Sequence, residues 1–343
     1  MSRLFEEKQI KNLKLKNRIV MPPMCMYCAK EDGLVTPWHI LHYITRAVGG
    51  TGLLIIEATG ICPEGRISAS DLGLWDDSQI QGMKALVDAV HENGAKIGIQ
   101  LNHAGRKCTA AGMDVEAPSP IPFDEESVLP REMTQADIEQ TVQEFKAAAA
   151  RAEEAGFDLI EIHGAHGYLL SEFLSPLTNK RTDHYGGSCE NRVRMLGEVI
   201  DAVKEVWPKE KPLAVRVSAE DYQENGNKAQ DLADMLKIVK EKGIDLINVS
   251  TGGVVSVAPK AFPGYQVPHA RLIKEETGLP VIAGGLITKP QEAEEILERG
   301  EADFIYLGRE LLRNPYWPLH ASEELHAQMP WPKQYERAKP HKK

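Results

Sequence analysis

The sequence has no apolar run long enough to cross a membrane, since none approaches the roughly 18 residues that a spanning helix needs. Its first 18 residues, MSRLFEEKQIKNLKLKNR, are charged throughout and contain no apolar signal core. Cysteine is scarce and odd in number, with five residues at positions 25, 28, 62, 108 and 189. Scattered cysteines of this kind are typical of free thiols in a reducing compartment. We therefore expect a cytoplasmic protein that does not bind a membrane.

An excess of positive charge is also missing. The chain has 40 Lys and Arg against 50 Asp and Glu, a formal net charge of −10. Without a basic stripe, an acidic protein is a poor binder of nucleic acid. The short basic end, Lys339 to Lys343, is expected to be a solvated tail. The composition therefore excludes nucleic acid as the expected partner.

Short apolar runs rich in β-branched residues recur along the chain and alternate with helical patterns. The predicted strands cover 18–21, 53–58, 96–101, 159–163, 213–217, 246–250, 281–283 and 304–307. The predicted helices cover 37–48, 77–93, 135–155, 190–206, 229–242, 268–277 and 290–299. This order predicts a single α/β domain over residues 1–343, folded as a (β/α)8 TIM barrel. A doubly wound sheet is the alternative, but no G-x-G-x-x-G follows any strand.

Two segments stand apart from this alternation. The first 17 residues are expected to form a short hairpin that closes the bottom of the barrel. Residues 104–134 are rich in proline and acidic residues and are too long for an ordinary connection between a strand and a helix. We expect this insertion after the third strand to be a lid over the site.

Glycines follow the last two strands, where TIM barrels often bind phosphate. They are Gly284 and Gly285 after the seventh strand and Gly308 after the eighth, with Arg309 beside Gly308. Glycines let backbone N–H groups approach phosphate oxygens, and an arginine binds them with two donors. The alternative is that the glycines only make tight turns, and Arg309 favours phosphate.

Arg216 lies inside the apolar strand LAVRVS. Because a guanidinium keeps its charge, it needs an anionic or electron-rich partner when it is buried. One alternative is an ion pair with Glu57 or Glu161. The other is a cofactor that gains negative charge, such as a reduced flavin, whose reduction potential a nearby cation raises. Gln100, at the end of the third strand, would bond the polar edge of the same ring.

The fourth strand ends in EIHGAHGYLL, which places His163, His166 and Tyr168 within six positions. A zinc site, an acid/base pair and a satisfied core pair are the three interpretations. Zinc proteases use two histidines four residues apart on a helix, with a glutamate between them. The spacing of His163 and His166 does not match this H-x-x-x-H pattern. We therefore expect no metal.

Four longer motifs resemble the old yellow enzyme family of flavin ene-reductases. They are PPMCMY after the first strand, QLNHAGRK after the third, EIHGAHGYLLSEFLSPLTNKRTDHYGGSCENR after the fourth and IYLGRELLRNP after the eighth. The cysteine in PPMCMY and the QYER tail make the chain similar to the bacterial, thermophilic-like branch of NADPH dehydrogenases. The likeness runs from about Leu4 to Arg337, nearly the whole chain.

This resemblance implies tightly but non-covalently bound FMN, hydride taken from NADPH or NADH, and an electron-poor alkene as acceptor. Carried over by position, its roles fall into three groups. The flavin would contact Pro23, Met24, Cys25, Ala58, Gln100 and Arg216, with the phosphate on Gly284, Gly285, Gly308 and Arg309. His163 and His166 would bind the substrate carbonyl, with Tyr168 as proton donor and Tyr27 in the substrate pocket. In this branch the tail, here residues 327–343, brings Arg337 into a neighbouring subunit's site, which implies a homodimer or homotetramer.

The chemistry of enone reduction explains the histidine pair independently. A conjugated alkene accepts hydride when the charge that develops on its carbonyl oxygen is stabilised, and two N–H donors form such an oxyanion hole. Cys25 and Cys28 also spell C-x-x-C, which leaves a disulfide couple sensitive to peroxide as a hypothesis. The alternative functions are a flavin-free barrel isomerase or aldolase acting on phosphorylated metabolites, and a flavin redox sensor.

Overall fold

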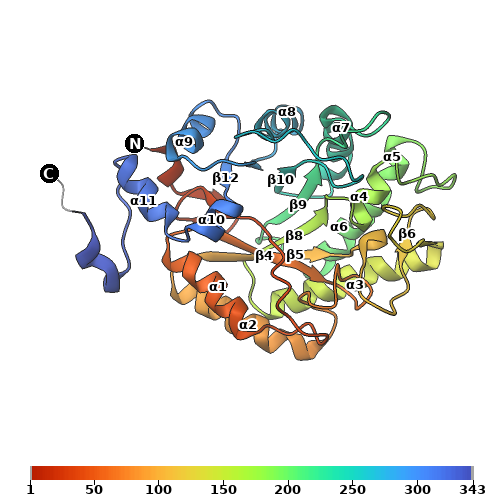
Figure 1. Ribbon diagram of the computed structural model, residues 1–343, viewed down its shortest axis with the longest axis horizontal. Coiled ribbons are helices and arrows are strands. Elements are labelled where there is room, and N and C mark those ends of the chain that lie inside the picture. The colour runs from red at the N-terminus through yellow and green to blue at the C-terminus, as the bar shows by residue number, and fades with distance from the viewer. Residues whose placement is uncertain (1, 341–343) are drawn as a thin grey trace.

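Eight parallel strands close into a barrel in the computed structural model, which describes residues 2–340 (Figure 1). Each strand pairs with its neighbours in chain order, and the last pairs with the first. The strands are β3 (Ile19–Met21), β4 (Leu53–Gly60), β5 (Lys96–Asn102), β8 (Leu159–Gly164), β9 (Leu213–Ser218), β10 (Leu246–Ser250), β11 (Val281–Ala283) and β12 (Phe304–Tyr306). The predicted (β/α)8 barrel is confirmed, and the strand bounds differ from the predicted ones by two residues at most.

The helices cover the outside of the barrel (Figure 1). The main ones are α1 (Pro37–Val48), α2 (Ile80–Glu92), α3 (Gln135–Glu154), α6 (Arg194–Val206), α7 (Ala229–Lys240), α8 (Val267–Thr277) and α9 (Pro290–Glu298). Proline stands at the first position of α1 and α9, where its missing N–H has no helical partner to lose. After β12 the chain forms α10 (Arg309–Arg313) and α11 (Trp317–Glu324).

Two predicted helices are divided in the structure. The predicted helix 190–206 is α5 (Cys189–Arg192) followed by α6, with Val193 between them. The predicted helix 77–93 begins as a 3-10 turn, η2 (Asp77–Gln79), because the Asp76 side chain accepts a hydrogen bond from the backbone N–H of Ser78 and starts the helix there. A further short helix, α4 (Leu169–Leu174), follows the histidine motif and was not predicted.

The barrel interior is apolar at one end and polar at the other. After η1 (Arg3–Phe5), a hairpin of β1 (Lys8–Ile10) and β2 (Leu13–Leu15) places Ile10, Leu13 and Leu15 in one buried cluster with interior strand residues such as Leu159 and Phe304. This hairpin therefore plugs the barrel, as predicted for residues 1–17. Because strand side chains alternate, the residues two positions after Ala214 and Leu246, Arg216 and Asn248, continue the same inner face toward the carboxyl ends of the strands.

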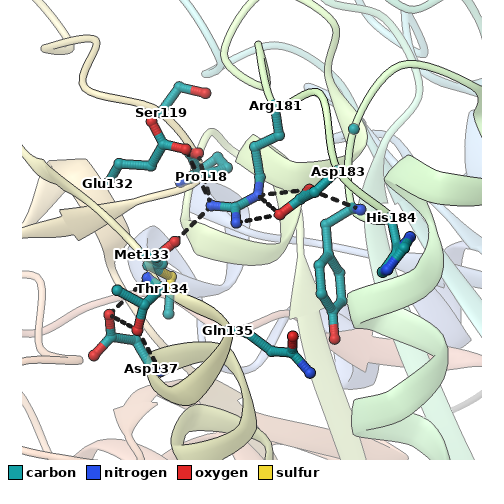
Figure 2. Close-up of polar contacts among 12 residues, drawn as sticks. Pro118, Ser119, Glu132, Met133, Thr134, Gln135, Asp137, Arg181, Asp183 and His184 are labelled. Atoms are coloured by element: carbon teal, nitrogen blue, oxygen red, sulfur yellow. Dashed lines mark hydrogen bonds and ion pairs between the residues drawn. The ribbon is translucent and has the colours of Figure 1, made fainter.

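The 104–134 insertion contains a 3-10 turn, η3 (Gly105–Lys107), and two short parallel strands, β6 (Glu116–Ala117) and β7 (Arg131–Glu132). Figure 2 shows how Arg181 contacts the two ends of this insertion. The guanidinium donates to the carbonyl oxygens of Pro118 and Met133, at 3.2 and 2.6 Å, and pairs with Asp183. The insertion is thus anchored to the segment that follows α4, at both of its short strands.

The chain after α11 ends in a 3-10 turn, η4 (Lys333–Ala338), which leaves the barrel body in Figure 1. The Tyr335 hydroxyl lies 3.4 Å from that of Tyr316 and ties the start of this turn to the barrel. The Arg337 side chain is exposed and makes no hydrogen bond or ion pair with any residue in the described range, 2–340.

Candidate active site

The register of the barrel strands places four of the predicted site residues at paired positions: Ala58, Gln100, His163 and Arg216. Ala58 of β4 is paired with Gln100 of β5, and Gln100 with Glu161 of β8. Two positions further along β8, His163 is paired with Arg216 of β9. These residues lie at the carboxyl ends of the strands, where TIM-barrel enzymes place their active sites.

His163 and His166 lie against each other, with ring centroids 5.2 Å apart and ring planes nearly perpendicular at 88°. His163 is buried, and its Nδ1 accepts a hydrogen bond of 3.3 Å from the backbone N–H of Ala165. The Nε2 of His166 lies 2.7 Å from the Ser250 hydroxyl. His166 has a positive φ of 61°, a conformation that is uncommon outside glycine. The local backbone therefore turns back to bring both rings together.

Both imidazoles are neutral near pH 7. Burial holds the pKa of His163 and of His166 well below the usual range, and the positive charges of Arg216 and Lys107 lower both further. A neutral imidazole has one N–H donor and one acceptor nitrogen. Each ring therefore has one N–H, and it stays a hydrogen-bond donor across the physiological pH range.

Tyr168 and Lys107 complete this cluster. The Tyr168 ring lies 4.9 Å from that of His163, and burial raises the pKa of its phenol, which therefore keeps its proton. The Lys107 ammonium lies 5.2 Å from the Tyr168 ring centroid and donates to the carbonyl oxygens of His166 and Gly253, at 3.0 and 3.2 Å. Burial lowers the pKa of Lys107 to about 8. Lys107 thus ties the insertion to the loops after β8 and β10.

Arg216 forms neither of the ion pairs considered from the sequence. Glu161 instead accepts hydrogen bonds from the amides of Gln100 and Asn248, at 2.7 and 2.8 Å. Glu57 accepts from the backbone N–H of Met26 and from the Tyr43 hydroxyl. Among residues 2–340, the Arg216 guanidinium has one hydrogen-bond contact, of 3.5 Å, to the Pro23 carbonyl oxygen, and its central carbon lies 5.8 Å from the centroid of the Tyr306 ring. Its buried Nε has no hydrogen-bond partner.

The segment after β3 borders the same site. Cys25 is half-buried, and burial raises the pKa of its thiol to about 12, with Asp71 and Glu57 adding to the shift. Tyr27 is 54% exposed and has a φ of 53°. Cys25 and Cys28 are both free thiols. Since a protonated thiol reacts slowly with peroxide, the high pKa of Cys25 disfavours the predicted disulfide couple, which stays a prediction.

The two glycines after β11 are places where a side chain would not fit, whereas the glycine after β12 has room for a Cβ. A Cβ on Gly284 would lie 2.4 Å from the Tyr306 ring, and one on Gly285, whose φ is 101°, would lie 2.9 Å from the Tyr265 ring. A Cβ on Gly308 would lie 3.6 Å from the Met24 sulfur, so the loops after β3 and β12 meet here. Arg309 begins α10, is exposed, and makes no side-chain hydrogen bond or ion pair in the described part of the chain.

A family model described as "NADH:flavin oxidoreductase / NADH oxidase family" matches residues 3–328. The chain belongs to this family. An NADPH dehydrogenase of Geobacillus thermodenitrificans is 57% identical over 335 residues, which cover 97% of this chain and 98% of that protein. The old yellow enzyme homologue of Zymomonas mobilis superposes with a TM-score of 0.81 at 28% identity, covering 98% of this chain and 99% of that one. A 2-naphthoyl-CoA reductase superposes with a TM-score of 0.89 at 27% identity, but this chain spans 52% of its length.

Family membership makes the chain an FMN-dependent oxidoreductase of the old yellow enzyme type, and the flavin-free isomerase or aldolase alternative is wrong. The residues present fit FMN. Arg216 carries a buried N–H without a hydrogen-bond partner, as a site for an electron-rich ring requires. The individual cofactor contacts remain predictions.

Two findings concern what the described residues lack. No helix between residues 2 and 340 is both long and apolar enough to cross a membrane. No group of three or more His, Cys, Asp or Glu side chains in the same part of the chain is arranged to hold a metal ion.

Sequence reasoning missed four residues that surround the histidine pair: Lys107, Gln266, Tyr306 and Ser218. Lys107 stands in the quoted motif QLNHAGRK, but a lysine in a loop is normally solvated. Gln266 has no sequence signal, since it precedes an ordinary helix. Tyr306 could have been found by alternation, because Phe304 and Tyr306 face the same side of β12.

Proposed function

We propose that this protein is an ene-reductase that uses NADPH to reduce C=C bonds conjugated to a carbonyl group, with nitroalkenes as further candidate acceptors. FMN, when bound, supplies the hydride, which it has taken from the nicotinamide. The observation that carries the proposal is the pair of neutral imidazoles, His163 and His166, beside the protonated Tyr168. Electron-poor alkenes need both a donor pair for their oxygen and a source of a proton.

The two histidines would bind the carbonyl oxygen of the acceptor. Each has one N–H, and neither His163 Nε2 nor His166 Nδ1 has a hydrogen-bond partner among residues 2–340. As hydride reaches the β-carbon, negative charge develops on the oxygen and strengthens these hydrogen bonds. A single donor of this kind is typically worth about 2.7–4 kcal/mol of barrier.

Tyr168 would donate the proton to the α-carbon. Its raised pKa keeps the phenol protonated, and its ring contacts that of His163. Tyr27 would contact the far end of the acceptor, since it combines a strained backbone with an exposed ring next to Cys25. Cys25, held as a thiol by burial, would lie against the flavin and tune its potential.

NADPH is proposed as the donor because the Geobacillus thermodenitrificans relative is named an NADPH dehydrogenase. Donor and acceptor would visit the same site in turn, because the barrel accounts for residues 19–306 and no second nucleotide-binding unit is folded within residues 2–340. Alternate occupation of one site gives ping-pong kinetics.

The active unit is proposed to be a homodimer or homotetramer in which Arg337 enters the site of a neighbouring subunit. In support, the η4 turn leaves the barrel body and Arg337 has no partner in its own chain within the described range. An exposed cation at the mouth of a neighbour's site would contact an anionic or carbonyl-bearing ligand. A cytoplasmic location accompanies this proposal.

The test is anaerobic stopped-flow of both half-reactions of the FMN-loaded enzyme, with NADPH and then with 2-cyclohexenone, a maleimide and a nitroalkene. We expect bleaching near 450 nm by NADPH, approximately the band of an oxidised flavin, and return of colour with the enone. The double variant His163→Ala, His166→Ala should slow the second step by about 100-fold or more. His184→Ala, in an exposed histidine, is the control. An unchanged second step in the double variant would overturn the proposal.

A further inference from the structure

A row of hydrogen-bonded side chains leads from the inner face of β12 to His166. The Tyr306 hydroxyl donates to Gln266 Oε1, and the Gln266 amide Nε2 donates to Ser250 Oγ at 3.2 Å. Ser250 Oγ lies 2.7 Å from His166 Nε2. All four residues are buried or nearly so, and they come from β12, the start of α8, β10 and the loop after β8.

The chemistry of each group gives this row a direction. Burial raises the pKa of Tyr306 to about 12, so the phenol keeps its proton and needs an acceptor, which is Gln266 Oε1. The amide nitrogen of Gln266 can only donate. Its two hydrogens are shared among three oxygens, those of Ser250, Thr251 and Tyr265. Ser250 Oγ therefore accepts a hydrogen bond from Gln266.

The remaining proton of Ser250 then goes to the best acceptor near it. Among residues 2–340, Ser250 Oγ lies 3.2 Å from Gln266 Nε2 and 2.7 Å from His166 Nε2, and the Tyr306 hydroxyl is a third hydrogen-bond neighbour. Because Gln266 Nε2 is a donor and a neutral imidazole nitrogen accepts better than a phenol oxygen, the serine proton points to His166 Nε2, which accepts it. The proton of the neutral His166 ring must then be on Nδ1.

We propose that Gln266 is a positioning residue that fixes the tautomer of His166 through Ser250, so that His166 presents Nδ1–H to the acceptor oxygen. His163 takes the opposite tautomer, because its Nδ1 accepts from the Ala165 N–H and its proton is on Nε2. The pair thus presents two different nitrogens as donors. This inference rests on the proposed function for its consequence in catalysis, although the tautomer itself does not depend on it.

The backbone around His166 is held so that the ring cannot readily turn to avoid this constraint. Its N–H donates to Ser218 Oγ at 2.9 Å, and its carbonyl oxygen accepts from Lys107. The loops pass so close that a Cβ on Gly167 would lie 2.2 Å from the Gly253 carbonyl oxygen. With the backbone fixed, the hydrogen bond at Nε2 decides which nitrogen carries the proton.

The decisive variant is Gln266→Glu, which replaces the N–H donor with an acceptor. Ser250 would then donate to the new carboxylate, and its oxygen would accept from His166, whose proton moves to Nε2. The donor would face Ser250 and no longer the acceptor oxygen. Loss of one oxyanion-hole donor typically lowers turnover by about 100-fold. Thr251→Val is the control, since it removes another partner of the same amide and leaves the path to His166 intact.

The measurement is 15N NMR of the imidazole nitrogens in the FMN-loaded enzyme labelled at histidine, with His166→Asn used to assign the signals. We expect His166 to carry its proton on Nδ1 in the parent and in Thr251→Val, and on Nε2 in Gln266→Glu. A parent protonated on Nε2, or a Gln266→Glu variant with an unchanged tautomer, would overturn the inference. If the tautomers behave as expected but the parent does not reduce 2-cyclohexenone, the proposed function fails and the positioning role stands.

Discussion

Glu57 connects the fold to the site, and its removal gives a sharp test of that connection. Alternation from Leu53 and Ile55 would point Glu57 into the barrel, but the register shifts between Ile56 and Ala58. A bulge of this kind re-aims a side chain. Ala58 takes the position beside Gln100, and the 1% exposed Glu57 turns toward α1.

There the carboxylate is bound on both oxygens. Oε1 accepts from the Met26 N–H at 3.1 Å, and Oε2 accepts from the Tyr43 hydroxyl at 3.0 Å. His39 Nε2 lies 3.7 Å from Oε2, and because the Thr36 N–H donates to His39 Nδ1, the His39 proton is on Nε2 and faces the carboxylate. Glu57 therefore fixes the backbone between Cys25 and the strained Tyr27.

We expect Glu57→Ala to destabilise the FMN-loaded enzyme by roughly 3–5 kcal/mol, since it removes two charge-assisted hydrogen bonds worth about 1.5–3 kcal/mol each. Glu57→Gln keeps a carbonyl oxygen for Met26 and should cost about 1–2 kcal/mol. Displacing the segment from Cys25 to Tyr27 should also raise the KM for enones in the alanine variant on the order of 10-fold or more.

Denaturant unfolding of the three proteins gives the stabilities, and steady-state kinetics with 2-cyclohexenone gives KM. The glutamine variant is the matched control, because it removes the charge and keeps the contact to Met26. Equal stability and equal KM in the parent and Glu57→Ala would refute the view that this carboxylate holds the segment after β3. An effect of the same size in Glu57→Gln would mean that charge, and not the Met26 contact, is what matters.

Three further predictions concern the tail, the cation and a buried acid. Deleting the chain after Pro332 should raise the KM for the enone or for NADPH, while FMN retention, measured by the ratio of flavin to protein absorbance, stays near that of the parent. Unaltered KM values would contradict the proposed role of Arg337 in a neighbouring subunit's site. Lys107→Met should move the acidic limb of enone reduction to higher pH, because the lost charge helps to lower the pKa of His166, whereas Lys107→Arg should leave that limb in place. Burial raises the pKa of Glu172 to about 8 from 4.5. Between these two pH values the folded state keeps a proton that the unfolded state releases. The free energy of unfolding should therefore fall as pH rises from about 4.5 to about 8, by at most about 1.4 kcal/mol per pH unit. Glu172→Gln should flatten that decline in urea unfolding curves, and an equally steep decline would contradict the assignment.

The parts of the fold that the sequence predicted well are those that depend on the pattern of neighbouring residues in the chain. The runs 246–250 and 281–283 match β10 and β11 residue for residue, because strands buried on both faces are predominantly apolar and β-branched. The break at Val193 was missed, since α5 and α6 share one continuous helical pattern and differ only in packing.

The candidate site could be predicted only in part. A long motif located His163, His166 and Tyr168 in the chain, and the charge inside the apolar strand LAVRVS located Arg216. The strand register then places His163 beside Arg216. The side chains that orient them come from segments distant in sequence: Gln266 reaches Ser250, and Lys107 reaches His166. Hydrogen-bond direction depends on these tertiary contacts, and a periodic pattern contains no information about it.

Two buried arginines differ in how many of their donor nitrogens are bonded. Arg46 is also buried, and all three of its donor nitrogens bond to carbonyl oxygens, those of His42, Leu311 and Leu312. It needs no ligand. Arg216 is equally buried at 6% exposed, but within the described residues it has one long hydrogen-bond contact, a position over the Tyr306 ring and an unpaired Nε. A charge left so poorly paired costs stability unless something else binds it. The two arginines differ in whether all their donor nitrogens are bonded, and the unpaired Nε of Arg216, more than the presence of arginine on a strand, supports the proposal that it binds the flavin.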